Sequence, residues 1–385
     1  MKKIIFLSLA LILTIFNFTS LRIENVQASE INDVVNCKSY ILIDKDSGKI
    51  LNENNSKERL PVASVTKLMT ILLTLEQISE GNIEVDDLVC VSENASGMGG
   101  SQIFLDANAE YPVGELLKSV IVCSANDSSV ALAEYISGSE DLFVKEMNKK
   151  AKELGLTDTN YENATGLPSP NQYSSALDVA LVLREVLDYP LYSTYSHIWL
   201  EDFAHPSGRT TEMTNTNKLS RFYEGCLGGK TGSTNEAKYC LAVGAERNNM
   251  RLIAVCLGSE TSKERFANCS NLLNYGFANF ENTVVFNSEN LENVKVKMQG
   301  QDKILSLKAD RDSNIITNKG KELKIDYQYN LPNSLESVKQ DEEVGTVEII
   351  VNGELYDTII LRATETIKEP SFMDYLKRIQ KDFVA

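Results

Sequence analysis

The stretch Pro61-Val62-Ala63-Ser64-Val65-Thr66-Lys67-Leu68-Met69-Thr70 places a hydroxyl and an amine directly before a very apolar segment. Residues 68–75 are too apolar for a surface helix, so they predict a helix at the centre of a domain. Ser64 and Lys67 are three residues apart, which puts them on one helical face. Burial lowers the pKa of an amine. The stretch therefore predicts a serine nucleophile, a neutral lysine base, and helix-start amides that face a developing oxyanion.

A second polar pair follows further along the chain, at Ser124-Ala125-Asn126. This triplet comes directly after the apolar run 116–122 and is followed at once by another helical stretch. The pattern predicts a tight loop between two helices, with both polar side chains directed into a cleft. Ser124 could relay a proton there, and Asn126 could hold a substrate amide.

A third set, Lys230-Thr231-Gly232, follows Gly228-Gly229 and precedes an apolar run that begins at Lys238. Lysine and threonine at such a place could hold a carboxylate by charge-assisted hydrogen bonds. A glycine on an edge strand lets a substrate backbone approach closely. Taken alone, the same residues also fit a plain turn that leads into a hairpin.

The order Ser-x-x-Lys, Ser-x-Asn, Lys-Thr-Gly resembles that of penicillin-binding proteins and serine β-lactamases. Within that group, five segments resemble the low-molecular-mass D-alanyl-D-alanine carboxypeptidases, the sporulation-type Gram-positive members above all: residues 61–70, 99–105, 125–134, 164–168 and 251–255. The resemblance runs from about residue 37 to residue 361. It implies an α+β fold: a penicillin-binding, serine β-lactamase-like domain whose antiparallel sheet is covered by helices, followed by a small all-β domain.

The resemblance also implies a role for each site residue. Ser64 would form the acyl-enzyme, with Lys67 as its base and Ser124 and Asn126 as the second motif. Lys230, Thr231 and Gly232 would bind the substrate's terminal carboxylate and backbone. Backbone N–H groups of Ser64 and Ser233 would form the oxyanion hole, and Arg265 would lie near the carboxylate. Neither a metal nor an organic cofactor is implied.

The implied reaction removes the terminal D-alanine from peptidoglycan stem pentapeptides, with penicillins as inhibitors. The chain departs from the family pattern at Leu227, Gly229, Ser233 and Gln172. These departures leave two alternatives open: a DD-endopeptidase or weak β-lactamase, and a wall protein that binds penicillin without turnover. A Glu-x-x-Leu-Asn loop, which deacylates class A β-lactamases, is absent from the sequence, and this disfavours efficient β-lactam hydrolysis.

The domain organisation follows from a change in the pattern of apolar and polar residues along the chain. At 385 residues, the length suits about two domains. Residues 29–281 mix strands and helices, with a strand at 39–44 and a hairpin that joins 238–245 to 251–257. Residues 282–365 carry short alternating runs and the hairpin turn Asn352-Gly353, which predicts a small all-β domain with a spacer or binding role.

Both ends of the chain predict contact with a membrane. Residues 1–28 have a basic start, an apolar run and a cleavage site with small residues, which is the pattern of a secretory signal peptide. The alternative is a membrane span that is retained. Residues 366–385 predict an amphipathic helix with one apolar face: Phe372, Tyr375, Leu376, Ile379 and Phe383. We expect an exported protein held peripherally on the outer face of the cytoplasmic membrane. The alternative is a terminal helix docked on the protein itself.

Composition narrows the chemistry further. The formal net charge of −16 argues against nucleic-acid binding. The sequence has two histidines, His197 and His205, which argues against a multi-histidine metal centre. Proton chemistry is therefore expected from other side chains. The seven cysteines show no metal-ligand spacing, and their odd number favours mostly buried free thiols, with one or two disulfides left open.

Overall fold

The computed structural model describes residues 31, 34–289, 291, 294–299, 303–373 and 375–376. The expected signal peptide lies outside the described residues, as do Ile379 and Phe383 of the expected C-terminal helix. The chain divides into two compact units, Met1–Asn279 and Phe280–Ala385, against an expected division after residue 281. Each unit has a hydrophobic core of its own.

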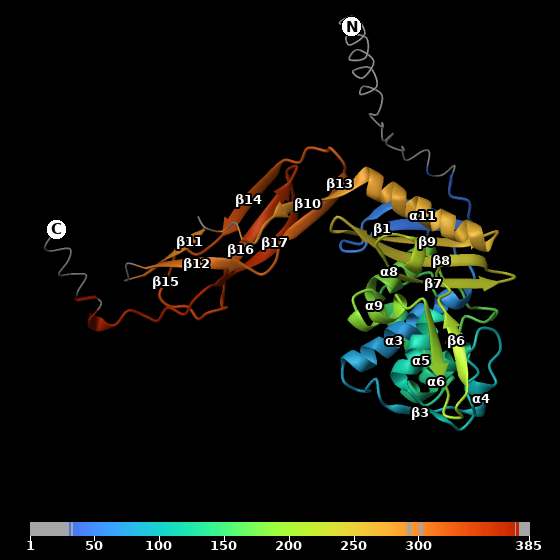
Figure 1. The fold of residues 1–385 in the computed structure, drawn as a ribbon. Coiled ribbons are helices and arrows are strands. Elements are labelled where there is room, and N and C mark those ends of the chain that lie inside the picture. The colour runs from blue at the N-terminus through green and yellow to red at the C-terminus, as the bar shows by residue number, and fades with distance from the viewer. Residues whose placement is uncertain are drawn as a thin grey trace, which may run out of the picture. The chain divides into compact units, whose positions relative to one another are not determined.

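The first unit is built on a five-stranded antiparallel sheet in the order β2-β1-β9-β8-β7 (Figure 1). The strands are β1 (Ser39–Asp44), β2 (Ile50–Asn54), β7 (Cys226–Thr234), β8 (Lys238–Arg247) and β9 (Met250–Ser259). The strand and the hairpin predicted from the sequence are confirmed. Because β7 pairs only with β8, it forms a free edge of the sheet.

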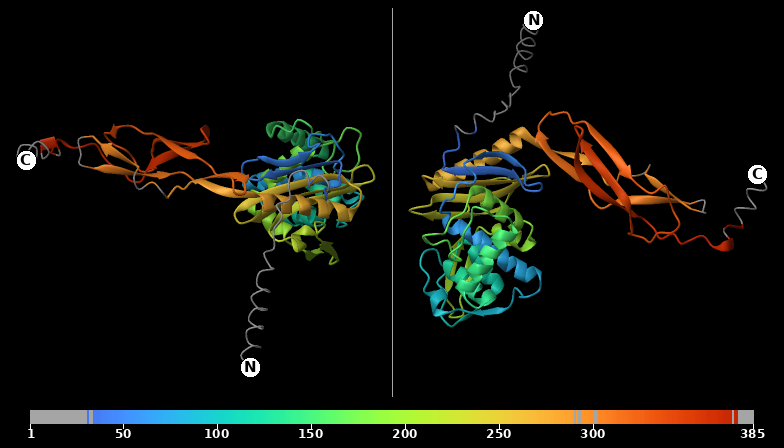
Figure 2. Two further views of the ribbon diagram at one scale, coloured as in Figure 1. Left: turned by 90° about the horizontal axis from the view of Figure 1, so that it is seen from above. Right: turned by 180° about the vertical axis from the view of Figure 1, so that it is seen from behind.

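Helices cover both faces of this sheet. Helix α11 (Ser262–Asn279) lies along one face, and α8 (Ala176–Val186) lies on the other (Figures 1 and 2). Gly276 of α11 permits the close approach, since a Cβ there would lie 2.4 Å from Leu252 Cδ1. The α+β architecture with a covered antiparallel sheet is therefore confirmed.

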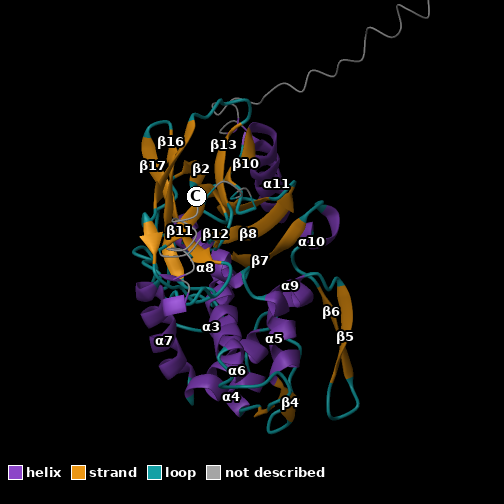
Figure 3. Ribbon diagram, turned by 90° about the vertical axis from the view of Figure 1, so that its left-hand side faces the viewer, coloured by secondary structure: helices purple, strands orange, loops and turns teal. Residues whose placement is uncertain are grey.

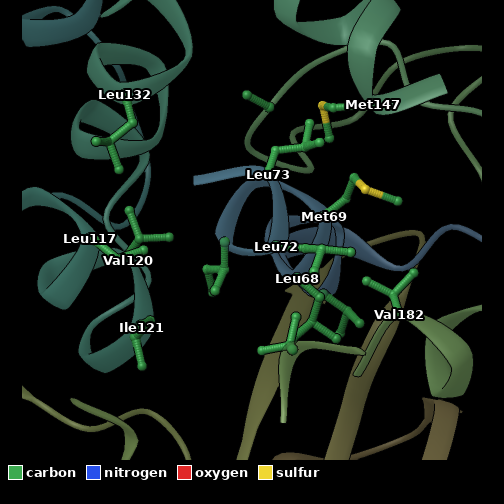
Figure 4. Close-up of a cluster of buried hydrophobic side chains, with 14 of the residues drawn as sticks. Leu68, Met69, Leu72, Leu73, Leu117, Val120, Ile121, Leu132, Met147 and Val182 are labelled. Atoms are coloured by element: carbon green, nitrogen blue, oxygen red, sulfur yellow. The ribbon is translucent and has the colours of Figure 1, made fainter. Parts of the chain in front are cut away.

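Helix α3 (Lys67–Ser79) runs through the centre of the helical part (Figure 3). Its residues from Lys67 to Leu75 are all buried, as the apolar sequence predicts. The side chains packed there are shown in Figure 4: Leu68, Met69, Leu72, Leu73, Leu117, Val120, Ile121, Leu132, Met147 and Val182. Four further helices supply this packing: α5 (Val113–Val122), α6 (Asn126–Ser137), α7 (Glu140–Glu153) and α8.

Shorter elements complete the first unit. The helices are η1 (Ala63–Thr66), α4 (Glu93–Ser96), α9 (Pro190–Ser196) and α10 (Leu219–Phe222). Two small antiparallel pairs join β3 (Leu88–Cys90) to β4 (Glu110–Pro112), and β5 (Leu200–Ala204) to β6 (Thr210–Thr214). Neither pair was predicted from the sequence.

The named elements of the second unit, which span residues 280–363, are all strands. Strand β10 (Phe280–Phe286) pairs with β13 (Ser313–Asn318). A six-stranded sheet has the order β14-β16-β17-β12-β11-β15. Its strands are β11 (Lys295–Met298), β12 (Ile304–Ala309), β14 (Ile325–Asn330), β15 (Ser334–Leu335), β16 (Glu343–Val351) and β17 (Glu354–Ala363).

The turn between β16 and β17 is the one predicted from Asn352-Gly353. Both residues have positive φ, at 53° and 88°, which this tight hairpin requires. The small all-β domain is therefore confirmed. Across the described part of the whole chain, no helix is both long and apolar enough to cross a bilayer.

Candidate active site

The site begins with the contact between Ser64 and Lys67. Ser64 lies in η1, and Lys67 is the first residue of α3. Lys67 Nζ lies 2.9 Å from Ser64 Oγ, and it donates a hydrogen bond of 2.6 Å to the backbone carbonyl of Thr165. The carbonyl engages one N–H of the amine, which leaves the nitrogen lone pair available to the serine hydroxyl. This is the geometry that a serine nucleophile and its amine base need.

Burial controls the charge of this amine. Lys67 is fully buried, and its desolvation lowers its pKa well below the usual range. The charge of Lys230 lowers the pKa of Lys67 further. Lys230 is also buried, which lowers its own pKa to about 7. The structure therefore gathers two desolvated amines around Ser64, with Lys67 in direct contact and Lys230 at longer range.

The loop that carries Thr165 holds the amine of Lys67 through the Thr165 carbonyl. Asn163 Oδ1 accepts hydrogen bonds from the backbone N–H groups of Thr165 and Gly166, at 3.2 and 2.7 Å. Gly166 has φ +81°, and a Cβ there would lie 2.0 Å from the Ala63 carbonyl oxygen. The sequence placed residues 164–168 in the family resemblance but gave Thr165 no part in the site. Its contribution is a backbone carbonyl, for which no side chain gives a signal.

Two residues beside the site have strained backbone. Ala63, just before the nucleophile, has φ +49°, and Ser124 has φ +67°. A non-glycine residue in this region costs about 1–3 kcal/mol, and such strain clusters at functional sites. The surrounding core maintains it, because both residues are buried.

Ser124 lies in the expected tight loop between α5 and α6, and Asn126 is the first residue of α6. Within the described structure, Ser124 Oγ and Asn126 Oδ1 are buried and lack a hydrogen-bond partner. Asn126 Nδ2 donates to the carbonyl of Gly99, at 2.6 Å, which fixes the amide plane. Buried polar atoms without partners are costly, so a ligand that supplies a donor would satisfy them. No hydrogen bond joins Ser124 to Ser64 or Lys67 among the described residues.

The Lys230-Thr231-Gly232 set lies on the exposed edge of the sheet, in β7. The side chains of Lys230 and Thr231 are buried, whereas Ser233 is exposed. A Cβ on Gly232 would lie 2.4 Å from the Val62 carbonyl oxygen and 3.0 Å from the Val65 nitrogen. Glycine at this position therefore lets β7 lie directly against the segment that carries the nucleophile.

Arg265 reaches the same strand from α11. Its Nη1 donates to the Gly232 carbonyl, at 3.1 Å, and its guanidinium lies over the rings of Tyr239 and Phe266. Burial lowers its pKa. Arg265 thus adds a positive charge on the side of β7 that faces α11.

Two of the departures from the family pattern have a structural reason. A Cβ on Gly229 would lie 2.3 Å from the Ala242 carbonyl oxygen, so the strand backbone is closely packed there. Gln172 stabilises the Thr165 loop, since its Oε1 accepts from the N–H groups of Glu162 and Asn163 and its Nε2 donates to the Leu167 carbonyl. Neither change removes a group that the site uses.

The described residues contain no group of three or more His, Cys, Asp or Glu side chains placed to hold a metal ion. The polar groups around Ser64 are amines, hydroxyls and an amide, which suit an anionic peptide end.

Comparison with protein families accounts for both units. The family model described as D-alanyl-D-alanine carboxypeptidase matches residues 25–261. The model described as penicillin-binding protein 5, C-terminal domain, matches residues 280–369. The two matches together cover most of the chain.

Individual relatives agree with these matches. The D-alanyl-D-alanine carboxypeptidase DacF of Bacillus subtilis (strain 168) is 41% identical over 354 residues, 90% of each chain. DacA of Escherichia coli (strain K12) is 32% identical over 360 residues, 89% of this chain and 87% of the relative. The solved structure of penicillin-binding protein 5 from Haemophilus influenzae superposes with a TM-score of 0.70 and 33% identity, covering 87% of this chain and 98% of the other. The chain belongs to the D-alanyl-D-alanine carboxypeptidase family, with a second domain of the penicillin-binding protein 5 C-terminal type.

Proposed function

We propose that this protein is a serine D-alanyl-D-alanine carboxypeptidase that acts on peptidoglycan stem pentapeptides. The observation that carries the proposal is the 2.9 Å contact between Ser64 Oγ and the desolvated amine of Lys67. Ser64 Oγ attacks the carbonyl carbon between the two D-alanines, and its proton passes to Lys67 Nζ. The oxyanion then accepts hydrogen bonds from the backbone N–H groups of Ser64 and Ser233, each worth about 10²–10³ in rate.

The second half of the reaction restores the enzyme. The C–N bond breaks, and the departing D-alanine amine takes a proton that Ser124 relays from Lys67. Water then attacks the acyl ester and gives a proton to Lys67 Nζ. The ester bond to Ser64 breaks, and Lys67 passes that proton to Ser64 Oγ. No cofactor takes part in these steps.

Substrate recognition falls to the free edge of the sheet. Lys230 and Thr231 bind the terminal carboxylate, with Arg265 adding positive charge behind the strand. Gly232 lets β7 lie against the segment that carries Ser64, and Asn126 Oδ1 accepts a substrate amide N–H. Penicillins mimic the same D-Ala-D-Ala end and acylate Ser64.

The test compares four readouts on the purified enzyme: D-alanine release, nitrocefin hydrolysis, penicillin acylation and cleavage of cross-linked dimers. A carboxypeptidase releases D-alanine from diacetyl-L-Lys-D-Ala-D-Ala in many turnovers and hydrolyses nitrocefin slowly. Fast nitrocefin turnover with little D-alanine would instead identify a β-lactamase. Stable acylation by penicillin without D-alanine release would identify a binding protein, and cleavage of cross-linked dimers alone would identify a DD-endopeptidase.

We further propose that residues 1–28 direct export and that residues 366–385 hold the enzyme on the outer face of the cytoplasmic membrane. Support comes from the exposed apolar side chains of Phe372, Tyr375 and Leu376 at the described start of this segment, which are 76%, 46% and 37% exposed. Ile379 and Phe383 would continue the same face. Deletion of residues 371–385 should move the protein from the membrane to the soluble fraction while activity on a soluble peptide survives. Retention of the truncated protein on the membrane would contradict the anchor.

A further inference from the structure

A hairpin outside the catalytic residues contacts the loop that holds Asn126. The hairpin joins β5 to β6, and residues 205–209 form its tip (Figure 3). The loop spans residues 99–106 and is called the 99–106 loop below. The backbone N–H of Asn126 donates to the Ser101 carbonyl at 2.7 Å, and Asn126 Nδ2 donates to the Gly99 carbonyl at 2.6 Å. The 99–106 loop therefore sets where the Asn126 amide lies.

The start of α6 holds the middle of this loop through its N–H groups. The buried carboxylate of Asp127 accepts hydrogen bonds from the backbone N–H groups of Ile103 and Leu105, both at 3.1 Å. Phe104, between these two residues, has φ +61°, and its side chain is exposed. A bulky residue rarely adopts this backbone, so contacts around it must maintain it. Because core packing does not hold the Phe104 ring, polar contacts to the loop have to do so.

Arg209, at the hairpin tip, supplies a contact on the carbonyl side of the loop. Its Nη2 donates to the Phe104 carbonyl at 2.6 Å and to Asp106 Oδ1 at 2.9 Å. Hydrogen bonds from a charged donor at such distances are stronger than neutral ones. The guanidinium thus links the hairpin tip directly to the strained residue of the 99–106 loop.

Thr211, on β6, makes a second link. Its Oγ1 donates to the Ile103 carbonyl at 3.1 Å. His205 Nε2 lies 2.9 Å from the same hydroxyl oxygen. His205 Nδ1 lies 3.0 Å from the Tyr111 hydroxyl and 3.2 Å from Arg209 Nη2. A guanidinium can only donate, so Nδ1 accepts and the proton of the neutral ring lies on Nε2. The Thr211 hydroxyl therefore accepts from His205, which turns its own proton toward the loop.

The ring of His205 stays neutral for a physical reason. Burial of His205, followed by the charge of Arg209, lowers its pKa below the usual value. The tip therefore presents two fixed donors to the 99–106 loop, one from Arg209 and one from Thr211.

We propose that Arg209 and Thr211 are positioning residues, which act through the 99–106 loop on Asn126 and so set how well the site accepts the substrate amide N–H. The inference rests on the proposed function, because it concerns the same site. Contact of either residue with the substrate is not required, since the route runs from the tip through the carbonyls of Ile103 and Phe104 to the loop that Asn126 grips.

The experiment uses two matched peptides with the full-length enzyme. One is diacetyl-L-Lys-D-Ala-D-Ala. The other carries D-lactate in place of the first D-alanine, which replaces the acyl-side N–H by an ester oxygen and keeps the scissile amide. We expect wild type to show a kcat/KM at least about fivefold higher for the first peptide, because the second leaves the buried Asn126 Oδ1 without a donor.

Two variants remove the links from the hairpin tip. In Arg209→Gln and in Thr211→Val, the ratio of the two kcat/KM values should fall at least about twofold. Tm should stay close to that of wild type, because exposed ion pairs contribute little to stability.

Each variant has a matched control that should keep the wild-type ratio. For Thr211→Val the control is Thr210→Val, since the exposed Thr210 side chain has no hydrogen-bond partner among the described residues. For Arg209→Gln the control is Arg251→Gln, since Arg251 lies on β9 and pairs with Asp46.

A double variant tests whether the effect passes through Asn126. Asn126→Ala should itself bring the ratio to about one. Adding Arg209→Gln to Asn126→Ala should then leave the ratio unchanged, because the group that Arg209 positions is gone.

The outcomes separate this inference from the proposed function. Equal kcat/KM for the two peptides in wild type, with D-alanine released from both, overturns the inference and leaves the carboxypeptidase standing. An equal loss of activity on both peptides in Arg209→Gln and Thr211→Val, with the ratio kept, shows a merely structural role and overturns it too. A further fall of the ratio in the double variant overturns the route through Asn126. Absence of D-alanine release from both peptides in wild type overturns the proposed function, and the inference with it.

Discussion

Lys67 Nζ donates a 2.6 Å hydrogen bond to the backbone carbonyl of Thr165, a residue 98 positions away in the sequence. The same nitrogen lies 2.9 Å from Ser64 Oγ. The carbonyl therefore holds the amine beside the nucleophile. A neutral amine in this position can take the proton of Ser64, whereas a protonated amine has no lone pair with which to take it.

Replacement of Lys67 by methionine should separate activity from stability. Lys67→Met keeps the length of the side chain and removes the base, which contributes typically about 10²–10⁴ in rate. We expect the acylation rate with a fluorescent penicillin to fall at least about a hundredfold. Burial of the Lys67 amine costs desolvation energy, and methionine removes that cost. The Tm of the variant should therefore equal or exceed that of wild type. An acylation rate near that of wild type would contradict the role of Lys67.

The pH profile of kcat/KM should be bell-shaped, because the two lysines are needed in opposite charge states. Lys67 must be neutral, so activity is lost as pH falls through its lowered pKa. Lys230 must be cationic to bind the carboxylate, so activity is lost as pH rises through about 7. In Lys230→Arg the guanidinium stays charged, and the alkaline limb should move to higher pH while the acid limb stays. An alkaline limb that does not move would contradict the assignment.

Much of this site is readable from the sequence because its parts are local. Ser64 and Lys67 share one turn, and Ser124 and Asn126 lie two positions apart at the start of α6. Thr165 and Gln172 are different, since they act through a backbone carbonyl and through hydrogen bonds to a distant loop. Such contacts exist only after the chain has folded.

The strands of the first unit also differ in how well the sequence predicts them. Strands β1, β8 and β9 are almost wholly buried, and their continuous apolar runs predict them. Strands β5 and β6 bury only Phe203 and Met213, one side chain each, so their sequences lack a clear alternating pattern.

Gly166→Ala should impair acylation through contact with the nucleophile segment. The added Cβ would lie 2.0 Å from the Ala63 carbonyl oxygen, so either the Thr165 loop or Ser64 must move. Gly155→Ala is the matched control, because Gly155 has a similar φ of +70° and open space around it. Gly155→Ala should lose about 1–2 kcal/mol of unfolding free energy to the left-handed backbone, and Gly166→Ala should lose more because of its contact with Ala63. Only Gly166→Ala should also slow penicillin acylation, and equal acylation in the two variants would contradict this packing.

The cysteines should differ in reactivity according to burial. All seven are free thiols, of which Cys226, Cys240, Cys256 and Cys269 are buried and Cys90 is exposed. Burial also raises the pKa of Cys226 and Cys240 to about 11, which suppresses the reactive thiolate. Mass spectrometry after iodoacetamide treatment of the native protein should find Cys90 alkylated and the four buried thiols intact. Their alkylation before unfolding, or their recovery as disulfides, would contradict the structure.

The central claim is that Ser64 is the acylated nucleophile. The direct measurement is labelling of the purified wild type and of Ser64→Ala with a fluorescent penicillin, followed by denaturing gel electrophoresis. The account predicts one strong covalent band for wild type and none for Ser64→Ala, with the same Tm for both proteins. Covalent labelling that persists in Ser64→Ala would contradict it.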